Sequence, residues 1–154
     1  MISVADFMTK DLVTVREADD LALAESLLRL GGIRHLPVVR DRKLVGILSH
    51  RDVLRSGFAG KPAARELAVS EVMTREPTSI RPAMGLAQAA RLMLERKFGC
   101  LPVCDDDGTL VGIVTEADFV RFAADVVRDL DLVAEAGRTQ ERTGEAESPL
   151  NPAG

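Results

Sequence analysis

Apolar and polar positions along this chain follow one succession of elements, and that succession occurs twice. In the first half, apolar residues spaced by three and four from Leu21 predict an amphipathic helix that is capped by Asp19 or Asp20 and ends at Gly31-Gly32. Two apolar runs separated by a tight turn then predict a β-hairpin. The predicted elements of this half are an amphipathic turn at 4–8, a strand at 13–15, the helix from 21, strands at 35–40 and 44–48, and a helix from 49 to about 56.

The second half repeats this order, β-α-β-β-α, with matching sequence blocks. Because one such unit cannot bury its apolar face alone, we expect the two copies to pack against each other across a pseudo-twofold axis. The predicted elements of this half are a strand at 78–81, a helix at 84–97, hairpin strands at 100–104 and 109–114, and a helix from 115. The repeated blocks are Met8-Thr9 and Met73-Thr74, Leu36-Pro37-Val38 and Leu101-Pro102-Val103, and Leu44-Val45-Gly46-Ile47 and Leu110-Val111-Gly112-Ile113.

The last helix of the second repeat is longer than its counterpart, because its pattern continues to about Ala136. Its apolar residues alternate steps of four and three, and Val126 to Val133 lie past the end of the repeat. Such residues would face water unless another chain covers them, so we predict a homodimer in which this stretch contacts the second subunit. The alternative is that the stretch folds back onto its own linker. The apolar stripe consists of Phe119, Ala123, Val126, Leu130 and Val133.

These patterns divide the chain into four parts. The last part is rich in Gly, Pro, Glu, Ser and Thr, and we predict no structure for it. The parts are a first repeat at 1–57, a linker at 58–68, a second repeat at 69–136 and a tail at 137–154.

Composition narrows the class of protein. The 154 residues include no Trp or Tyr, so the core must be aliphatic, and the net charge of −4 provides no basic footprint for nucleic acid. Cys100 and Cys104 are the only cysteines, and their spacing on a strand predicts two core residues of a reduced protein rather than a metal or redox site. No apolar run reaches membrane-spanning length, so we expect a soluble, cytoplasmic protein with no membrane partner.

One local pattern carries candidate chemistry: glycine, two apolar residues, a hydroxyl, two residues and Asp. It runs from Gly46 to Asp52 and again from Gly112 to Asp118. A helix-capping box would explain either copy alone. Its recurrence at the ends of equivalent strands favours an anionic ligand beside a helix N-terminus, with the Asp accepting from two ribose hydroxyls and the hydroxyl meeting a phosphate.

Taken together, these blocks resemble the cystathionine beta-synthase (CBS) domain, and the tandem resembles the paired unit often called a Bateman module. The resemblance covers Val4 to about Arg121. It implies an α+β fold, in which two pseudo-twofold β-α-β-β-α repeats pack small, mainly antiparallel sheets together with helices outside. It also implies adenosyl ligands in clefts between the repeats and a flat, disc-shaped dimer.

Carried over by residue, the resemblance implies two clefts that differ in charge. The first has Arg51, with His50 adjacent, to meet phosphate oxygens, and we expect it to be the tighter phosphate site. The second has Glu116 and Ala117 there and would depend on Arg34 or His35. The alternative for these basic residues is a solvated surface. The first cleft combines Thr78, Phe98, Gly99, Cys100 and Pro102 with Ser49, His50, Arg51 and Asp52; the second combines Val13, Ile33, Arg34, His35 and Pro37 with Thr115 and Asp118.

The function that follows is a regulatory module for an adenosyl ligand, with AMP, ADP or ATP favoured and S-adenosylmethionine or NAD as further options. We expect no enzymatic activity and no bound metal, because the chain offers no nucleophile with a positioned base and no Gly-rich phosphate loop. No catalytic, channel or DNA-binding domain is recognisable, so regulation would act through an unidentified partner protein or its own oligomer. Two alternatives stay open. One is an interaction scaffold whose Ser/Thr-x-x-Asp patterns are only caps, and the other, disfavoured by the mild acidity, is a DNA-associated regulator.

Overall fold

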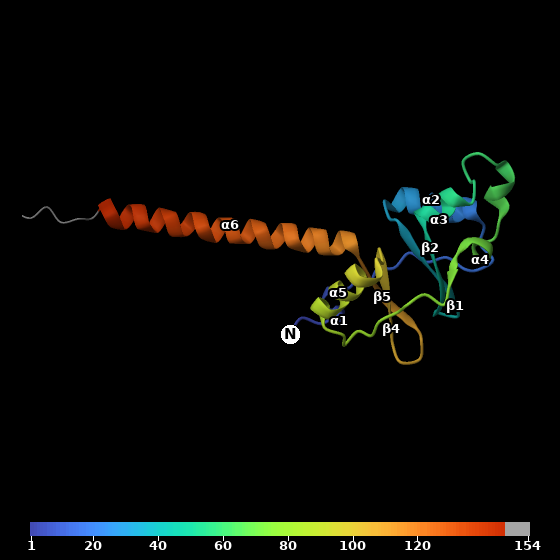
Figure 1. Ribbon diagram of the computed structural model, residues 1–154, viewed down its shortest axis with the longest axis horizontal. Helices are drawn as coiled ribbons and strands as arrows, with labels where there is room; N and C mark the ends of the chain where they lie inside the picture. Colours follow the sequence, from blue (N-terminus) through green and yellow to red (C-terminus); the bar gives the residue numbers. More distant parts are fainter. Residues whose placement is uncertain (147–154) are drawn as a thin grey trace, which may run out of the picture. The chain divides into compact units, whose positions relative to one another are not determined.

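The computed structural model describes residues 1–146 of the chain. It divides into two units, Met1–Thr115 and a second unit that begins at Glu116, and each is described by itself. The first unit contains both hairpins and has the α+β architecture that the sequence predicts (Figure 1). The elements of the first unit are α1 (Val4–Phe7), α2 (Leu21–Gly31), β1 (His35–Arg40), β2 (Lys43–Ser49), α3 (His50–Arg55), the 3₁₀ helix η1 (Pro62–Glu66), α4 (Val69–Val72), β3 (Thr74–Arg75), α5 (Leu86–Arg96), β4 (Cys100–Cys104) and β5 (Leu110–Thr115).

The helix boundaries in the first half follow local chemistry. The carboxylate of Asp20 accepts a hydrogen bond from the Leu23 N–H at 2.8 Å, which fixes the start of α2. Gly32 ends the helix in the left-handed conformation, with φ of 60°. Antiparallel β1 and β2 follow, and the apolar face of α2 packs on them. The resulting core contains Leu21, Ala24, Leu28, Leu36, Val38, Leu48 and Val53.

The second half has the equivalent helix and an equivalent antiparallel hairpin of β4 and β5. The strands predicted at 13–15 and 78–81 are reduced to single parallel bridges, from Val15 to Val38 and from Ile80 to Val103. Each segment bonds its hairpin through one residue before the chain turns toward the next helix. The short strands were therefore correctly located but overestimated in length.

The leading segments of the two repeats are exchanged. Thr9 exchanges backbone hydrogen bonds of 2.9 and 3.0 Å with Ile113 of the second hairpin. In the same way, β3 pairs with β2, where Thr74 lies opposite Ile47. Each copy therefore completes the hairpin of the other, an arrangement that the linear repeat boundaries do not predict.

Two glycines of the repeated motif make this exchange possible. A Cβ placed on Gly46 would overlap the sulfur of Met73, and one on Gly112 would overlap the sulfur of Met8. A side chain at either position would push the exchanged segment off its hairpin. The repeated Met-Thr and Gly-Ile blocks thus correspond to one packing contact that occurs twice.

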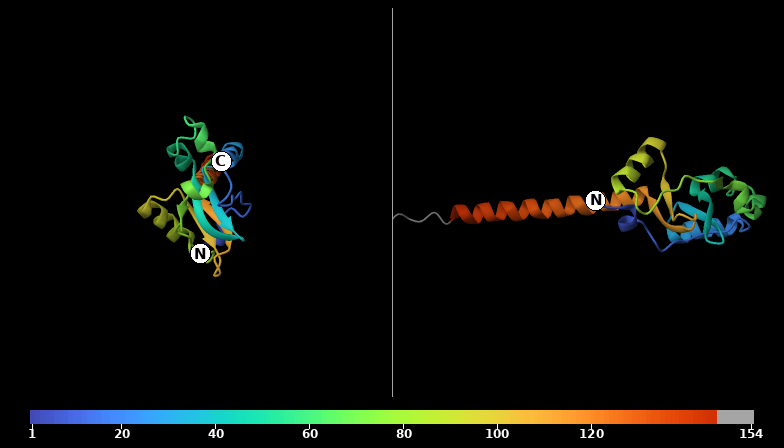
Figure 2. Two further views of the ribbon diagram at one scale, coloured as in Figure 1. Left: turned by 90° about the vertical axis from the view of Figure 1, so that its right-hand side faces the viewer. Right: turned by 90° about the horizontal axis from the view of Figure 1, so that it is seen from below.

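The two hairpins lie side by side, as Figures 1 and 2 show. At their tips the Leu44 N–H donates to the Gly108 carbonyl at 3.2 Å, and the Leu110 N–H donates to the Arg42 carbonyl at 3.0 Å. Leu44 and Leu110 are equivalent positions of the two repeats, and so are Arg42 and Gly108. The two hydrogen bonds are therefore related by the predicted pseudo-twofold axis. The ammonium group of Lys43, which lies between them, is 3.5 Å from the Asp107 carboxylate across the seam.

The linker packs on the first half. The Leu21 N–H donates to the Leu67 carbonyl at 2.9 Å, and the Val69 N–H donates to the Asp19 carbonyl at 2.8 Å. Ala64 of η1 is buried. These contacts hold the end of the linker against the start of α2, where α4 begins.

The second unit is α6 (Glu116–Ala146), a continuous helix (Figure 1). The expectation that the helix ends near Ala136 is wrong for 137–146, which are helical. The hydroxyls of Thr139 and Thr143 donate to carbonyls one turn earlier, and the Arg, Gln and Glu residues here are good helix formers. The rest of the predicted tail, 147–154, lies outside the described residues. Within 1–146, no helix has both the length and the apolar character needed to cross a bilayer.

Candidate functional site

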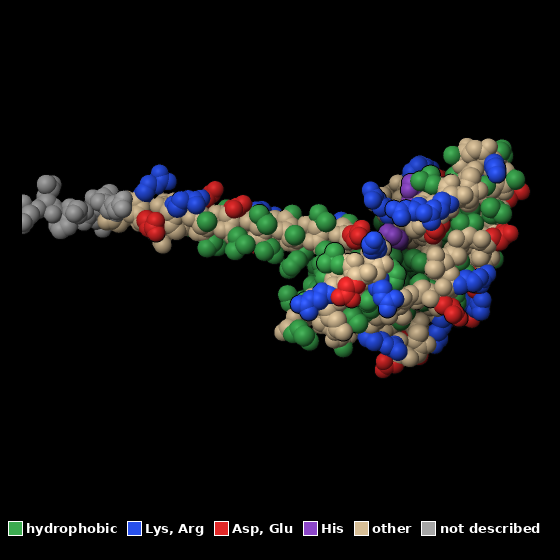
Figure 3. Space-filling model, viewed as in Figure 1, with side chains coloured by type: hydrophobic (Ala, Val, Ile, Leu, Met, Phe, Trp, Pro, Cys, Tyr) green, Lys and Arg blue, Asp and Glu red, His purple; other side chains and the backbone are tan. Residues whose placement is uncertain are grey.

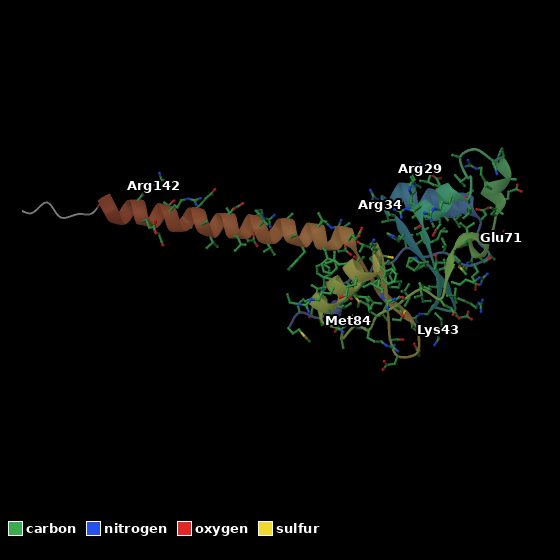
Figure 4. All side chains as sticks on the ribbon, viewed as in Figure 1. Arg29, Arg34, Lys43, Glu71, Met84 and Arg142 are labelled. Carbon is green, nitrogen blue, oxygen red and sulfur yellow. The ribbon has the colours of Figure 1, made fainter. Side chains whose placement is uncertain are left out.

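Residues of both predicted clefts lie at one end of the paired hairpins. His35 lies opposite Ser49 in the first hairpin, and Cys100 lies opposite Thr115 in the second. The His35 ring bridges the two halves, because a Cβ placed on Gly99 would be 2.9 Å from its Cε1 and Nε2 atoms. Only glycine fits there without moving the ring. The tips, with Lys43, form the opposite end, as the labels of Arg34 and Lys43 indicate (Figure 4).

Ser49 and Asp52 form a complete capping box at the start of α3. The Ser49 hydroxyl accepts from the Asp52 N–H at 3.1 Å, and Asp52 Oδ2 accepts from the Ser49 N–H at 2.9 Å. The capping interpretation is therefore correct for this copy. Within the described residues, the other carboxylate oxygen, Oδ1, has no protein partner. Capping and ligand binding thus use different atoms and do not exclude each other.

Asp118 has one side-chain partner that Asp52 lacks. Its Oδ1 accepts from the Arg121 guanidinium at 2.6 Å in an ion pair on α6. Asp118 belongs to the second unit, whereas Thr115 ends β5 in the first. The second cleft, which needs Asp118 beside Val13, Ile33, Arg34, His35 and Pro37, therefore stays a prediction.

Several predicted site residues contribute backbone rather than side chains. Pro37 and Pro102 are fully buried, and their carbonyls accept from the N–H groups of Val15 and Ile80 at 3.1 and 3.0 Å. These bonds hold the segments of Val13 and Thr78, whose side chains are exposed. The prolines thus position the segments that can touch a ligand.

The two cysteines of β4 are free thiols and are buried, which agrees with their predicted place in the core. Burial raises the pKa of the Cys104 thiol above its ordinary value. A thiol held in its neutral form is a poor nucleophile. Across 1–146, no group of three His, Cys, Asp or Glu side chains is arranged to hold a metal ion.

Basic side chains surround the start of α3. The His50 N–H donates to the Arg34 carbonyl at 2.8 Å, which holds the residue before β1 beside the helix start. Arg34, His50 and Arg51 are all exposed. Figure 3 shows the two histidines close to Lys and Arg side chains on this face. Nearby Arg29 (Figure 4) is already paired with Glu25 at 3.3 Å.

A shallow depression of about 400 Å³ lies on the side of α3 that faces the linker and α4. Of the predicted site residues, only Asp52 reaches it. Arg55 and Glu71 add charges there that the sequence analysis did not select, since they lie outside the repeated motif. Glu71 reaches the first hairpin through the exchange of leading segments, which the repeat does not predict. The lining residues are Asp52, Arg55, Ser56, Leu67, Glu71 and Val72.

Comparison with known proteins places this geometry in context. The family model of the CBS domain matches residues 4–58 and 69–125. The chain is 37% identical over 119 residues to the CBS domain-containing protein YhcV of Bacillus subtilis, covering 77% of this chain and 83% of that protein. It is 38% identical over 112 residues to inosine-5'-monophosphate dehydrogenase of Korarchaeum cryptofilum, covering 73% of this chain but only 22% of that enzyme.

Solved structures resemble the chain over most of its length. A protein of Vibrio cholerae named AcuB has a TM-score of 0.76 and 38% identity, covering 85% of this chain and 96% of that chain. CBSX2 of Arabidopsis thaliana, in complex with AMP, has a TM-score of 0.72 and 36% identity over 80% and 97% of the two chains. The CBS domain pair of MJ0100, in complex with 5'-methylthioadenosine and S-adenosyl-L-methionine, has a TM-score of 0.71 and 28% identity over 80% and 97%.

Proposed function

The chain belongs to the CBS domain family, and on this basis we propose that it is a regulatory module that binds an adenosyl ligand, with AMP, ADP or ATP favoured, between its two repeats. S-adenosylmethionine and NAD are further candidates. The observation that carries the proposal is the meeting of both repeats at one end of the hairpins, where the His35 ring touches Gly99 beside Ser49 and Asp52. The complexes of CBSX2 with AMP, and of the MJ0100 domain pair with two adenosyl compounds, support this class of ligand.

In the first cleft, the ribose would bind Asp52. Its Oδ1 is unpaired within the described residues, and a carboxylate oxygen accepts strong hydrogen bonds from hydroxyls. Phe98 and Gly99, before β4, would line the base, and exposed Thr78 would close the opposite side. The buried residues Cys100 and Pro102 would support this wall from behind.

The second cleft would use the equivalent positions in exchanged roles. Val13, Ile33 and Pro37 would line the base, and Thr115 with Asp118 would meet the ribose and phosphate. The phosphate would also depend on Arg34 or His35. The Asp118–Arg121 ion pair would have to share the carboxylate with a ligand. We therefore expect weaker binding there.

The proposal describes a regulator rather than an enzyme. The chain spans about a fifth of the length of the matched dehydrogenase, so the activity of that enzyme is not carried over. Regulation would pass to a partner protein or to a second copy of the chain. Buried free thiols at Cys100 and Cys104 fit a reducing, cytoplasmic compartment.

We also propose a homodimer through α6. Val126, Leu130 and Val133 are 40%, 63% and 71% exposed, although they form one apolar stripe. A second copy of the helix would remove this stripe from water.

Calorimetry and thermal unfolding with AMP, ADP, ATP, adenosine, S-adenosylmethionine and NAD test the ligand. A ligand at a hundred times its dissociation constant stabilises the folded state by about 2.7 kcal/mol. The complete capping box favours one other function, an interaction scaffold in which Ser49 and Asp52 serve the helix alone. Unshifted unfolding with every ligand would favour that scaffold and refute the adenosyl proposal.

A further inference from the structure

One face of α6 complements itself in size when the direction of the helix is reversed. The seam positions of this face follow one another in alternating steps of three and four, as in a two-stranded coiled coil. In each of the outer apolar pairs, a larger residue in one half of the stripe corresponds to a smaller residue in the other half. Counted inward from the two ends, the apolar pairs are Phe119 with Gly137, Ala123 with Val133 and Val126 with Leu130, and Glu116 and Gln140 occupy the seam positions just outside them.

The apolar surface extends to one side of the seam. Val120 and Val127, each next to a seam residue, are 68% and 56% exposed. A depression of about 630 Å³ runs beside the seam, and Val120, Ala123 and Val127 belong to its lining. From 138 to 145 the helix has no large apolar residue. The surface that needs cover therefore begins near Phe119 and ends at Gly137, and a second copy of the same stretch has the length to cover it.

We propose that α6 pairs with α6 of a second copy of the chain in the antiparallel direction, with the twofold axis at Arg128. This inference rests on the proposed homodimer and adds its orientation and register. With the axis at this position, half-buried Phe119 faces Gly137 of the second copy, and Ala123 faces Val133. Facing a large residue with a small one fills each layer without a cavity or overlap. Every contact occurs twice, as a twofold interface requires.

A parallel pair in register would place each seam residue opposite its own copy. The Phe119 layer would be crowded and the Ala123 layer would leave a cavity, and both faults cost stability. Glu116 would also face Glu116 of the second copy, and two carboxylates at one layer repel each other. In the antiparallel pair Glu116 instead faces Gln140, whose amide group can donate to the carboxylate. Size and charge therefore favour the same direction.

Shifting the antiparallel pair by one heptad is unfavourable either way. One shift places Glu116 opposite the apolar Val133, and the other places Ala123 opposite Gln140. A polar group that faces an apolar side chain loses its hydrogen-bond partners. The register with its axis at 128 does bring Asp129 near its own copy. The Arg128 guanidinium, 3.5 Å from Asp129 in the same helix, offsets that repulsion.

The experiment is disulfide cross-linking of the full chain, read as migration at twice the chain mass on a non-reducing gel. The double variant Ala123→Cys/Val133→Cys should cross-link on oxidation, whereas each single variant should not. Within one helix these two positions lie about 15 Å apart, too far for a disulfide inside one chain. The native Cys100 and Cys104 are buried and present in every variant. Arg121→Cys/Val133→Cys is the matched control and should stay unlinked, because Arg121 lies on the opposite side of α6 from the seam.

The outcomes separate this inference from the proposed homodimer. Cross-linking of Ala123→Cys alone would show a parallel pair, which overturns the inference and leaves the homodimer through α6 standing. A chain that sediments as a dimer but cross-links in none of these variants would also overturn it. A monomeric wild-type chain would refute both the homodimer and its orientation. Sedimentation of the wild type needs no substitution, and the reduced double variant should sediment in the same way, so a folding defect would not be mistaken for either result.

Discussion

Asp52→Asn separates the two roles of the carboxylate at the start of α3. In the wild type, Oδ2 accepts the Ser49 N–H at 2.9 Å, and Oδ1 has no protein partner within the described residues. The Asn carbonyl oxygen can keep the bond to Ser49, because Asn caps helices about as well as Asp. The Asn amide group would then occupy the place of Oδ1, where it is a donor and cannot accept from a ribose diol.

The magnitudes follow from these two atoms. The free energy of unfolding without ligand should change by less than about 0.5 kcal/mol, because the cap is kept. Hydrogen bonds to a charged group contribute about 1.5–3 kcal/mol, so nucleotide affinity should fall about tenfold to a hundredfold. Asp52→Ala is the comparison, since it removes the cap as well and should cost about 0.5–2 kcal/mol of stability.

Urea unfolding without ligand measures the stability of each variant, and calorimetry with AMP and adenosine measures affinity. Adenosine is informative because it has the ribose but no phosphate, so its loss of affinity reports on the diol alone. Asp52→Asn that binds both ligands as tightly as the wild type would refute the ribose assignment. A large loss of stability in the same variant would show that the capping argument is wrong.

Three further predictions concern the exchange, the seam and α6. Gly46→Ala should destabilise the protein by about 1–3 kcal/mol, because its Cβ would overlap Met73. Gly60→Ala is the control, since no atom lies within 4 Å of the new Cβ. Equal urea midpoints for the two variants would contradict the packing argument. Nucleotide binding should slow hydrogen exchange of the Leu44 and Leu110 amides, which cross the seam, and protection confined to one repeat would count against coupling. The full chain should sediment as a dimer and a chain ending at Asp125 should not; an unchanged dimer after truncation would remove α6 from the interface, and a monomeric full chain would refute the prediction.

Much of the fold could be predicted because it is local. The Asp20 cap, the Gly32 termination and the two hairpins each depend on residues within a few positions of one another. The tail was judged by composition, which underestimated the helix. Good helix formers continue past Gly137, and Thr139 and Thr143 bond back to the preceding turn.

The exchange of leading segments could not be predicted from the repeat. Met8 could pack on Gly46 or on Gly112, and the flanking blocks are nearly identical in both copies. The apolar pattern is equally compatible with either pairing of the leading segments and hairpins, so it cannot distinguish between them. The chain path decides: the second hairpin accepts Thr9, and the linker, held by Leu67 and Val69, delivers β3 to the first.

At the candidate site, positions that differ between the repeats indicate function better than positions that the repeats share. Residues that the repeats share, such as Ser49 and Asp52, have a structural role that the capping box satisfies in full, so their recurrence alone does not separate a cap from a ligand site. Positions where the repeats differ are more informative, because the backbone pattern that both copies share does not explain the difference. Gly99 is explained by the His35 ring, which leaves no room for a side chain. Packing gives no such reason for Arg51, which is exposed and unpaired within the described residues. Chemistry specific to this chain is therefore best sought where its two halves disagree.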